Sequence, residues 1–154
     1  MRTTILLVLA IVTASFAALS TTTVAGYLDQ LGAAYQEEDG AFWLLAEDSL
    51  SGEAFPIFYI EVNASLEACF MAGPTPGLVP ASGADRAVAF AKLAELNASY
   101  PFVKFEHDVS TGEIICTYTF STENGVGLEA FSAMLQVIFG TMDETAAELA
   151  ALRQ

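Results

Sequence analysis

One segment of the chain, residues 55–62, reads Phe55-Pro56-Ile57-Phe58-Tyr59-Ile60-Glu61-Val62. Aromatic and branched aliphatic side chains dominate it, and both classes favour extended strands. Successive side chains of a strand point to opposite faces of a sheet, so Phe58 and Ile60 share one face and Ile57 and Tyr59 share the other. Both faces of this predicted strand are therefore apolar.

Similar runs lie on either side of this segment. Phe42-Trp43-Leu44-Leu45-Ala46 precedes it, and Leu66 to Ala72 follows it. The connections, Ser49 to Glu53 and Asn63 to Ser65, are short and polar, which is typical of antiparallel hairpins. The three runs are therefore predicted to form a three-stranded meander.

The first of these strands repeats the two-faced pattern, because Trp43 lies opposite to Phe42 and Leu44. A sheet with one face in water carries polar residues on that face, so apolar residues on both faces predict that each is covered at least in part. Helices of the same chain cover one face. On the other we expect another protein, a second copy of the chain or a ligand, and the candidate partner-binding residues there are Trp43, Ile57 and Tyr59.

The segment from Gly73 to Gly83 holds three of the five prolines and three of the eleven glycines. It is predicted to be an irregular connection, and connections of this length are often mobile or functional. Two interpretations stay open, a plain linker and a partner-binding loop. In the second, Leu78 and Val79 are the candidate partner-binding residues.

Helical periodicity marks three further segments. Thr23 to Gln36 is predicted as the first helix, ended by the acidic turn from Glu37 to Gly40. Asp85 is predicted to cap a second helix, Arg86 to Ala98. A long last helix is predicted from about Gly127.

Two more strands, Phe102 to His107 and Glu113 to Phe120, are predicted on either side of the hairpin turn Asp108 to Gly112. The element order is then α-β-β-β-α-β-β-α. This order predicts a single α+β domain with a five-stranded antiparallel sheet packed by helices.

The N-terminus has the order of a secretory signal peptide. Arg2 supplies the positive charge, Ile5 to Val12 forms the apolar run, and small residues follow. We predict cleavage after Ala17. A cut after Ala25 would remove the start of the first helix.

These boundaries place a signal peptide at residues 1–17 and one α+β domain at residues 18–154. The apolar run is shorter than the roughly 20 residues that a membrane-spanning helix needs, although an uncleaved anchor stays open as an alternative. We therefore expect an exported protein, periplasmic or secreted, with no stable membrane span after cleavage.

Charge excludes two classes of partner. The chain has 5 Lys and Arg against 19 Asp and Glu, a net charge of −14. Nucleic acids and anionic membranes both attract clustered Lys and Arg, so neither is expected to bind here. With 54% hydrophobic residues the chain is also no disordered acidic tail, because it can fill a core.

No group of residues predicts catalysis or a cofactor. His107 stands beside Asp108, but neighbouring strand residues point to opposite faces and do not orient each other. The sequence lacks the G-x-S-x-G pattern of serine hydrolases, and one His with two Cys cannot make a convincing zinc site. We expect a protein that is not an enzyme and uses no metal or cofactor.

Cys69 falls in the third predicted strand and Cys116 in the fifth. An oxidising compartment would favour a disulfide between them. If Leu66 and Phe70 share the core with Tyr118, however, the two sulfur atoms lie on opposite sides of the sheet. Pairing is therefore disfavoured but stays open.

Several pieces of sequence carry a family resemblance. They are Leu28, Leu31 and Gly32, Trp43-Leu44-Leu45, Phe55 to Ile60, Leu93-Ala94-Glu95-Leu96-Asn97, Phe102-Val103-Lys104-Phe105, and the Asp108 to Gly112 turn into Glu113-Ile114-Ile115. With these residues and this element order, the chain resembles the YbjN domain family from about Val24 to Phe139. Members of that family have a fold like the type III secretion chaperones.

The resemblance implies a non-catalytic binding or regulatory protein, with a homodimer as one form. We expect a chaperone- or adaptor-like protein-interaction module in a bacterial cell envelope. The alternative is an exported binder of a small apolar ligand held between the sheet and the last helix. A dry, enclosed pocket would favour that alternative.

Overall fold

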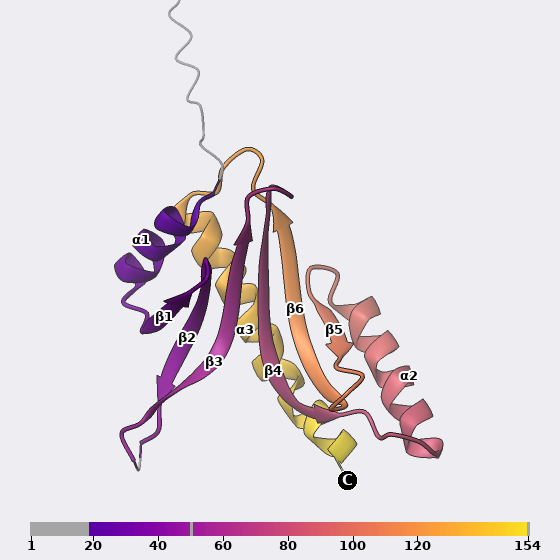
Figure 1. Cartoon of the computed structure of the whole chain (residues 1–154). Coiled ribbons are helices and arrows are strands. Elements are labelled where there is room, and N and C mark those ends of the chain that lie inside the picture. Colours follow the sequence, from indigo (N-terminus) through magenta and orange to yellow (C-terminus); the bar gives the residue numbers. More distant parts are fainter. Residues whose placement is uncertain (1–18, 50, 154) are drawn as a thin grey trace, which may run out of the picture.

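The computed structural model describes residues 19–49 and 51–153, so the predicted signal peptide lies outside the described residues. Three helices and six strands make up the fold (Figure 1). Their bounds are α1 Thr21–Leu31, β1 Tyr35–Glu38, β2 Ala41–Glu47, β3 Ala54–Asn63, β4 Ala68–Leu78, α2 Ala84–Ser99, β5 Lys104–His107, β6 Glu113–Ser121 and α3 Leu128–Ala150, followed by a short 3-10 helix, Ala151–Arg153. The strands form one antiparallel sheet in the order β1-β2-β3-β4-β6-β5.

This architecture confirms the α+β class, the antiparallel sheet and the meander, but the predicted number of five strands is wrong. The missed strand is β1, which the sequence interpretation placed in the end of the first helix and the acidic turn. The helix ends at Leu31 instead of Gln36 because Gly32 adopts the left-handed conformation, with φ of 67°, and donates its N–H to the Asp29 carbonyl.

The turn that follows β1 completes the correction. Asp39 and Gly40 have φ of 51° and 82°, the pair of positive values that a two-residue hairpin turn requires. Their turn brings Glu38 opposite Ala41 and starts the β1–β2 ladder. The acidic run is therefore half strand and half turn.

The irregular segment predicted from Gly73 is also shorter than expected, because β4 continues to Leu78. β3 and β4 pair only as far as Tyr59 opposite Ala72, whereas β4 and β6 pair beyond that point. Pro74 therefore lies where β4 has lost its β3 neighbour. A proline there removes no hydrogen bond from a two-sided ladder.

One face of the sheet, which we call the covered face, packs against α3. It comprises Phe42, Leu44, Phe58, Ile60, Cys69, Met71, Ile114 and Cys116, all of them buried. The rings of Phe58 and Phe139 lie 4.7 Å apart between their centroids, and Figure 1 shows α3 crossing the sheet diagonally. None of the helices in the described part of the chain has the length and hydropathy that a membrane span requires.

α2 is fastened at the β5 end of the sheet. Its N-cap is Gly83, without a side-chain hydrogen bond, and not Asp85 as predicted. Lys92 contacts Glu148 of α3 at 3.0 Å. Asn97 accepts the N–H of Phe105 at 2.7 Å and donates to the Phe105 carbonyl at 3.1 Å. These two hydrogen bonds tie the last turns of α2 to the backbone of Phe105 in β5.

The two cysteines are free and buried. In the β4–β6 ladder, Cys69 pairs with Phe120 and Cys116 pairs with Gly73. Both sulfur atoms therefore lie on the covered face, which corrects the expectation that they point to opposite sides. Cys69 lies opposite Phe120, which is four residues, or roughly 13 Å, along β6 from Cys116. A disulfide needs Cα atoms within about 7 Å, so the two cysteines are too far apart to pair.

Candidate functional site

The opposite side of the sheet, which we call the open face, carries apolar side chains without a covering helix. The strand register places the apolar residues Trp43, Tyr59, Phe70, Ala72, Pro74 and Ile115 on it. Ile57 lies at a bulge of β3, without a partner on β2, and its side chain contacts both this side and the core. Trp43 is 38% exposed, and its neighbours Ile57, Tyr59 and Ile115 are only partly buried. The sequence prediction of a two-faced apolar sheet is confirmed, and one face is left uncovered by the described residues.

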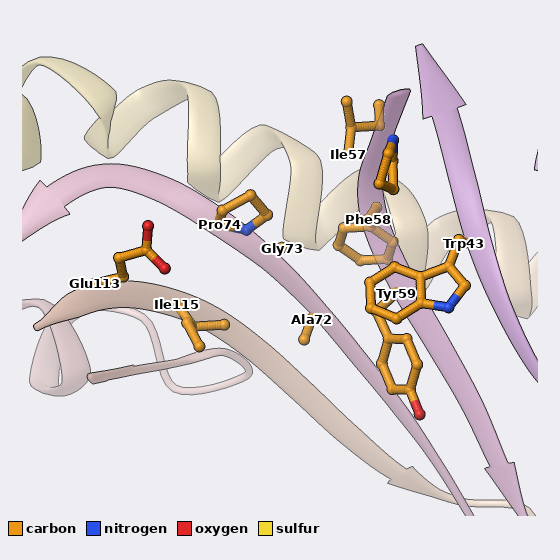
Figure 2. A pocket seen from close by; sticks show the side chains of 10 residues that line it. Trp43, Ile57, Phe58, Tyr59, Ala72, Gly73, Pro74, Glu113 and Ile115 are labelled. Atoms are coloured by element: carbon orange, nitrogen blue, oxygen red, sulfur yellow. The ribbon is translucent and has the colours of Figure 1, made fainter. Parts of the chain in front are cut away.

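A groove of about 400 Å³ runs along the open face, and we call it the sheet groove (Figure 2). Its lining residues are Trp43, Pro56, Ile57, Phe58, Tyr59, Ala72, Gly73, Pro74, Glu113 and Ile115. They come from β2, β3, β4 and the start of β6. All but Glu113 are apolar or glycine, so the sheet groove offers one carboxylate at one end and little other polar chemistry.

The sheet groove exists because β3 and β4 separate. Their ladder ends at Tyr59 and Ala72, and Pro56 and Pro74, which both lie beyond it, have no N–H to extend it. Gly73 contributes no side chain to the gap, and the ring of Phe58 occupies that space, because a Cβ on Gly73 would lie 2.8 Å from Cδ2 of Phe58. Phe58 thus closes the bottom of the gap from the covered face, and the open side stays hollow.

An aromatic pair borders the sheet groove. Trp43 and Tyr59 are direct partners across β2 and β3, and their ring centroids are 4.7 Å apart (Figure 2). Aromatic pairs at this separation stabilise each other, which fixes the orientation of both rings. The ring of Tyr59 also lies 6.2 Å from the ring of Phe70, so the three aromatic rings form one cluster.

Beyond this aromatic pair lies a second hollow of about 270 Å³, which we call the acidic notch. Its lining residues are Glu38, Asp39, Ala41, Trp43, Tyr59 and Glu61. Trp43 and Tyr59 line both hollows, so the acidic notch and the sheet groove are neighbours that share this aromatic pair.

The Tyr59 hydroxyl donates to Oε2 of Glu61 at 2.8 Å. Burial, followed by this hydrogen bond and the charge of Glu61, raises the pKa of Tyr59 to about 12. The phenol therefore stays neutral at physiological pH, and it positions the Glu61 carboxylate beside the aromatic pair.

The structure brings three of the five candidate partner-binding residues together: Trp43, Ile57 and Tyr59 line the same groove. Leu78 ends β4 half-buried and pairs with Glu113 at the end of the groove, but it is not among the lining residues. Val79 is 4% exposed, and its N–H donates to the Gly112 carbonyl at 2.7 Å. Its side chain belongs to the core and has almost no surface to offer a partner.

Sequence reasoning missed the other half of the site, notably Ala72, Pro74 and Ile115. The sequence pattern predicts an irregular connection at Gly73 and Pro74, and the signal for the gap is that Pro56 and Pro74 both lack an N–H where the β3–β4 ladder ends. The same pattern predicts a turn at Glu38 and Asp39 and gives no role to Glu61. Only the strand register shows that they converge.

The remaining chemistry is sparse. His107 is half-buried, with its ring 5.1 Å from the Phe90 ring in an edge-on contact. Within residues 19–49 and 51–153, no three His, Cys, Asp or Glu side chains are grouped as a metal site would need. Burial raises the pKa of the Cys116 thiol to about 12, and burial together with the charge of Glu61 does the same for Cys69, so neither is a ready nucleophile.

Comparison with solved structures shows the fold. YbjN from E. coli has a TM-score of 0.62 at 19% identity, covering 87% of this chain and 96% of that one. The HopA1–SchA chaperone–effector complex gives 0.53 at 10% identity, covering 80% and 89%. The ExoU–SpcU heterodimer from the type III secretion system of Pseudomonas aeruginosa gives 0.51 at 20%, covering 82% and 94%.

No curated protein matched the sequence. A family profile did match, over residues 20–151, which span every helix and strand from α1 to α3. The family is YbjN, described as "Putative bacterial sensory transduction regulator". The chain therefore belongs to the YbjN family.

Proposed function

We propose that this protein is a non-catalytic, chaperone- or adaptor-like module that binds another polypeptide on its open face, in the cell envelope or outside the cell. The observation that carries the proposal is the sheet groove. An apolar hollow bordered by the fixed rings of Trp43 and Tyr59 has the composition of the centre of a protein interface.

The comparisons support a polypeptide as the occupant. HopA1–SchA is a chaperone–effector complex, and ExoU–SpcU is a heterodimer. One chain of each complex has a fold similar to that of this chain. The similarity brings protein binding to this chain as a proposal, and the open face supplies the surface for it.

The shape of the site favours a polypeptide over a small apolar ligand. The sheet groove opens outward on the open face, whereas a small-molecule binder encloses most of its ligand. The carboxylates beside it, Glu61 and Glu113, disfavour nucleic acid, whose phosphates would be repelled.

A peptide-library selection tests the proposal. Random peptides are selected on the full protein, and binding of each selected peptide is measured from the fluorescence of Trp43, the only tryptophan of the chain. We expect peptides rich in aliphatic and aromatic residues, and a shift of Trp43 emission on binding because a seated peptide removes water from its exposed edge.

A pair of variants locates the binding. Ile115→Ser removes an apolar contact from the sheet groove, and loss of about 1.4 kcal/mol would weaken binding about tenfold. Val109→Ser is the matched control, because Val109 is 85% exposed in the β5–β6 turn. Selected peptides that bind both variants and the wild type equally well would overturn the proposal, as would a selection that yields no binder.

A further inference from the structure

The acidic notch has a composition that the sheet groove alone does not explain. In one cross-strand row, Glu38 of β1 pairs with Ala41 of β2, and Ala41 pairs with Glu61 of β3. A small residue thus separates two carboxylates whose strands are roughly 10 Å apart across the sheet. The row leaves room for a side chain between two negative charges.

The walls of the acidic notch suit a cation. Trp43 and Tyr59 line it together with the carboxylates. A guanidinium or ammonium group is attracted to the face of such rings as well as to carboxylates, and the two attractions add when water is partly removed. Neutral apolar side chains would gain the rings but would leave Glu38 and Glu61 without compensation.

No Lys or Arg is among the residues that line the acidic notch or the sheet groove. Arg86 donates to the Pro80 carbonyl at 3.0 Å, and Lys92 pairs with Glu95 and Glu148. Lys104 is on the open face but occupies β5, at the opposite edge of the sheet from β1, and Arg153 lies in the 3-10 helix after α3. The charge of the notch is therefore left for a partner to balance.

A second copy of the chain fits this surface poorly. Two open faces brought together would place Glu38, Glu61 and Glu113 of each copy in one interface, with Lys104 as the one basic residue that the strand ladders put on this face. Each molecule also carries a net charge of −14. Like charges placed opposite each other in an interface cost binding free energy and slow association. Charge complementarity favours a basic partner over self-association.

From these observations we infer the chemistry of the occupant: a basic polypeptide segment whose aliphatic side chains fill the sheet groove while a Lys or Arg enters the acidic notch between Glu38 and Glu61. The inference rests on the proposed function and adds the partner's charge. Because the two hollows share Trp43 and Tyr59, such a segment would place its basic side chain and its aliphatic side chains on either side of this aromatic pair.

Three synthetic peptides of equal length test it. In each peptide every second residue is isoleucine or valine. The residues between them are all lysine in the first peptide, all glutamine in the second and all glutamate in the third. Binding to the full chain is followed by Trp43 emission. We expect the lysine peptide to bind about tenfold or more tightly than the glutamine peptide, a difference that shrinks in high salt, and the glutamate peptide to bind weakest.

Paired variants assign the effect to the notch. Glu38→Gln/Glu61→Gln removes both charges and keeps an oxygen acceptor for Tyr59. We expect it to weaken the lysine peptide about tenfold and to leave the glutamine peptide unchanged. Glu67→Gln/Glu123→Gln is the control, because it removes the same charge from exposed residues outside the notch. Glu38→Gln alone should show part of the effect without touching the Tyr59 bond.

The outcomes separate the two proposals. Equal binding of the lysine and glutamine peptides, both weakened by Ile115→Ser, would overturn the basic partner and leave the proposed function standing. Failure of all three peptides and of the library selection would overturn both. A dimer in sedimentation whose Trp43 emission changes with protein concentration would show that a second copy occupies the face, and would overturn the basic partner as well.

Discussion

The two faces of β3 both carry large apolar residues, but one face is buried and the other is partly exposed. Phe58 and Ile60 are 1% and 0% exposed under α3, whereas Ile57 and Tyr59, on the same strand, stay partly open to water. Both sides of the strand carry large apolar side chains, although the open face also carries Glu61, so the presence of apolar residues does not by itself decide which side is buried. The difference teaches that the covered face stabilises the fold, and that the open face carries apolar surface that stability alone does not require.

Truncation of one residue on each face is the strongest test of this difference. Phe58→Ala removes a ring that packs on Phe139 and Gly73, and we expect it to cost about 3–5 kcal/mol of the free energy of unfolding. Ile57→Ala, one position earlier and in the lining of the sheet groove, should cost about 1 kcal/mol, because its side chain is only partly buried. Urea unfolding at neutral pH measures both values.

Equal losses for the two variants would contradict the comparison. Such a result would mean that the open face is closed in solution, by a second copy or by another part of the chain. Repeating the measurement over a range of protein concentrations distinguishes these, since stability conferred by a second copy rises with concentration.

Neighbouring small residues on β4 give a test of intermediate size. A Cβ on Gly73 would lie 2.7 Å from Cε of Met142 and 2.8 Å from Cδ2 of Phe58, so Gly73→Ala should cost about 1–3 kcal/mol. Ala72→Ser, on the floor of the sheet groove, should change stability by about 0.5 kcal/mol or less. The midpoint of thermal unfolding, followed by circular dichroism, checks the pair. A Gly73→Ala protein as stable as the wild type would show that Phe58 does not cross the gap.

The sequence was sufficient for the parts of the fold that depend on local pattern. The alternation in residues 55–62 predicted both faces of β3, and the Asp108 to Gly112 turn predicted the β5–β6 hairpin. β1 was missed because its four residues, three of them polar, carry no hydrophobic alternation, and its signal was the Asp39-Gly40 turn.

The site depends on long-range pairing that a single sequence does not specify. Trp43, Ile57 and Tyr59 could be chosen from alternation alone. Ile115 belongs beside them only because β6, and not β5, adjoins β4, and that choice places Glu113 at the end of the sheet groove. The same limit produced the error over Cys69, whose face follows from its register opposite Phe120.

The smallest expected effect comes from Tyr59, whose environment lies between those of the two faces. Its pKa is about 12 when folded against an ordinary value of 10, so the folded state holds the phenol proton more tightly than the unfolded state does. The resulting contribution to stability is complete below pH 10 and is lost as pH rises from 10 to 12. Tyr59→Phe should therefore lose less stability than the wild type over that interval.

Glu61→Gln separates the causes of the raised Tyr59 pKa, because burial is the largest cause and the hydrogen bond and charge of Glu61 are the smaller ones. The buried thiols of Cys69 and Cys116 also lower the stability of the protein at high pH, because their pKa values are raised as well. Cys116 is present in the wild type and in both variants and is unaffected by Glu61, so differences between the three stability curves report mainly on Tyr59. Urea midpoints and tyrosinate absorbance over the same pH range measure the effect. If Glu61→Gln leaves the pKa of Tyr59 near 12, burial alone sets it, and the open face is drier at Tyr59 than at Trp43. If the pKa falls toward 10, Tyr59 is held by its carboxylate partner, and the wall of the acidic notch depends on that bond.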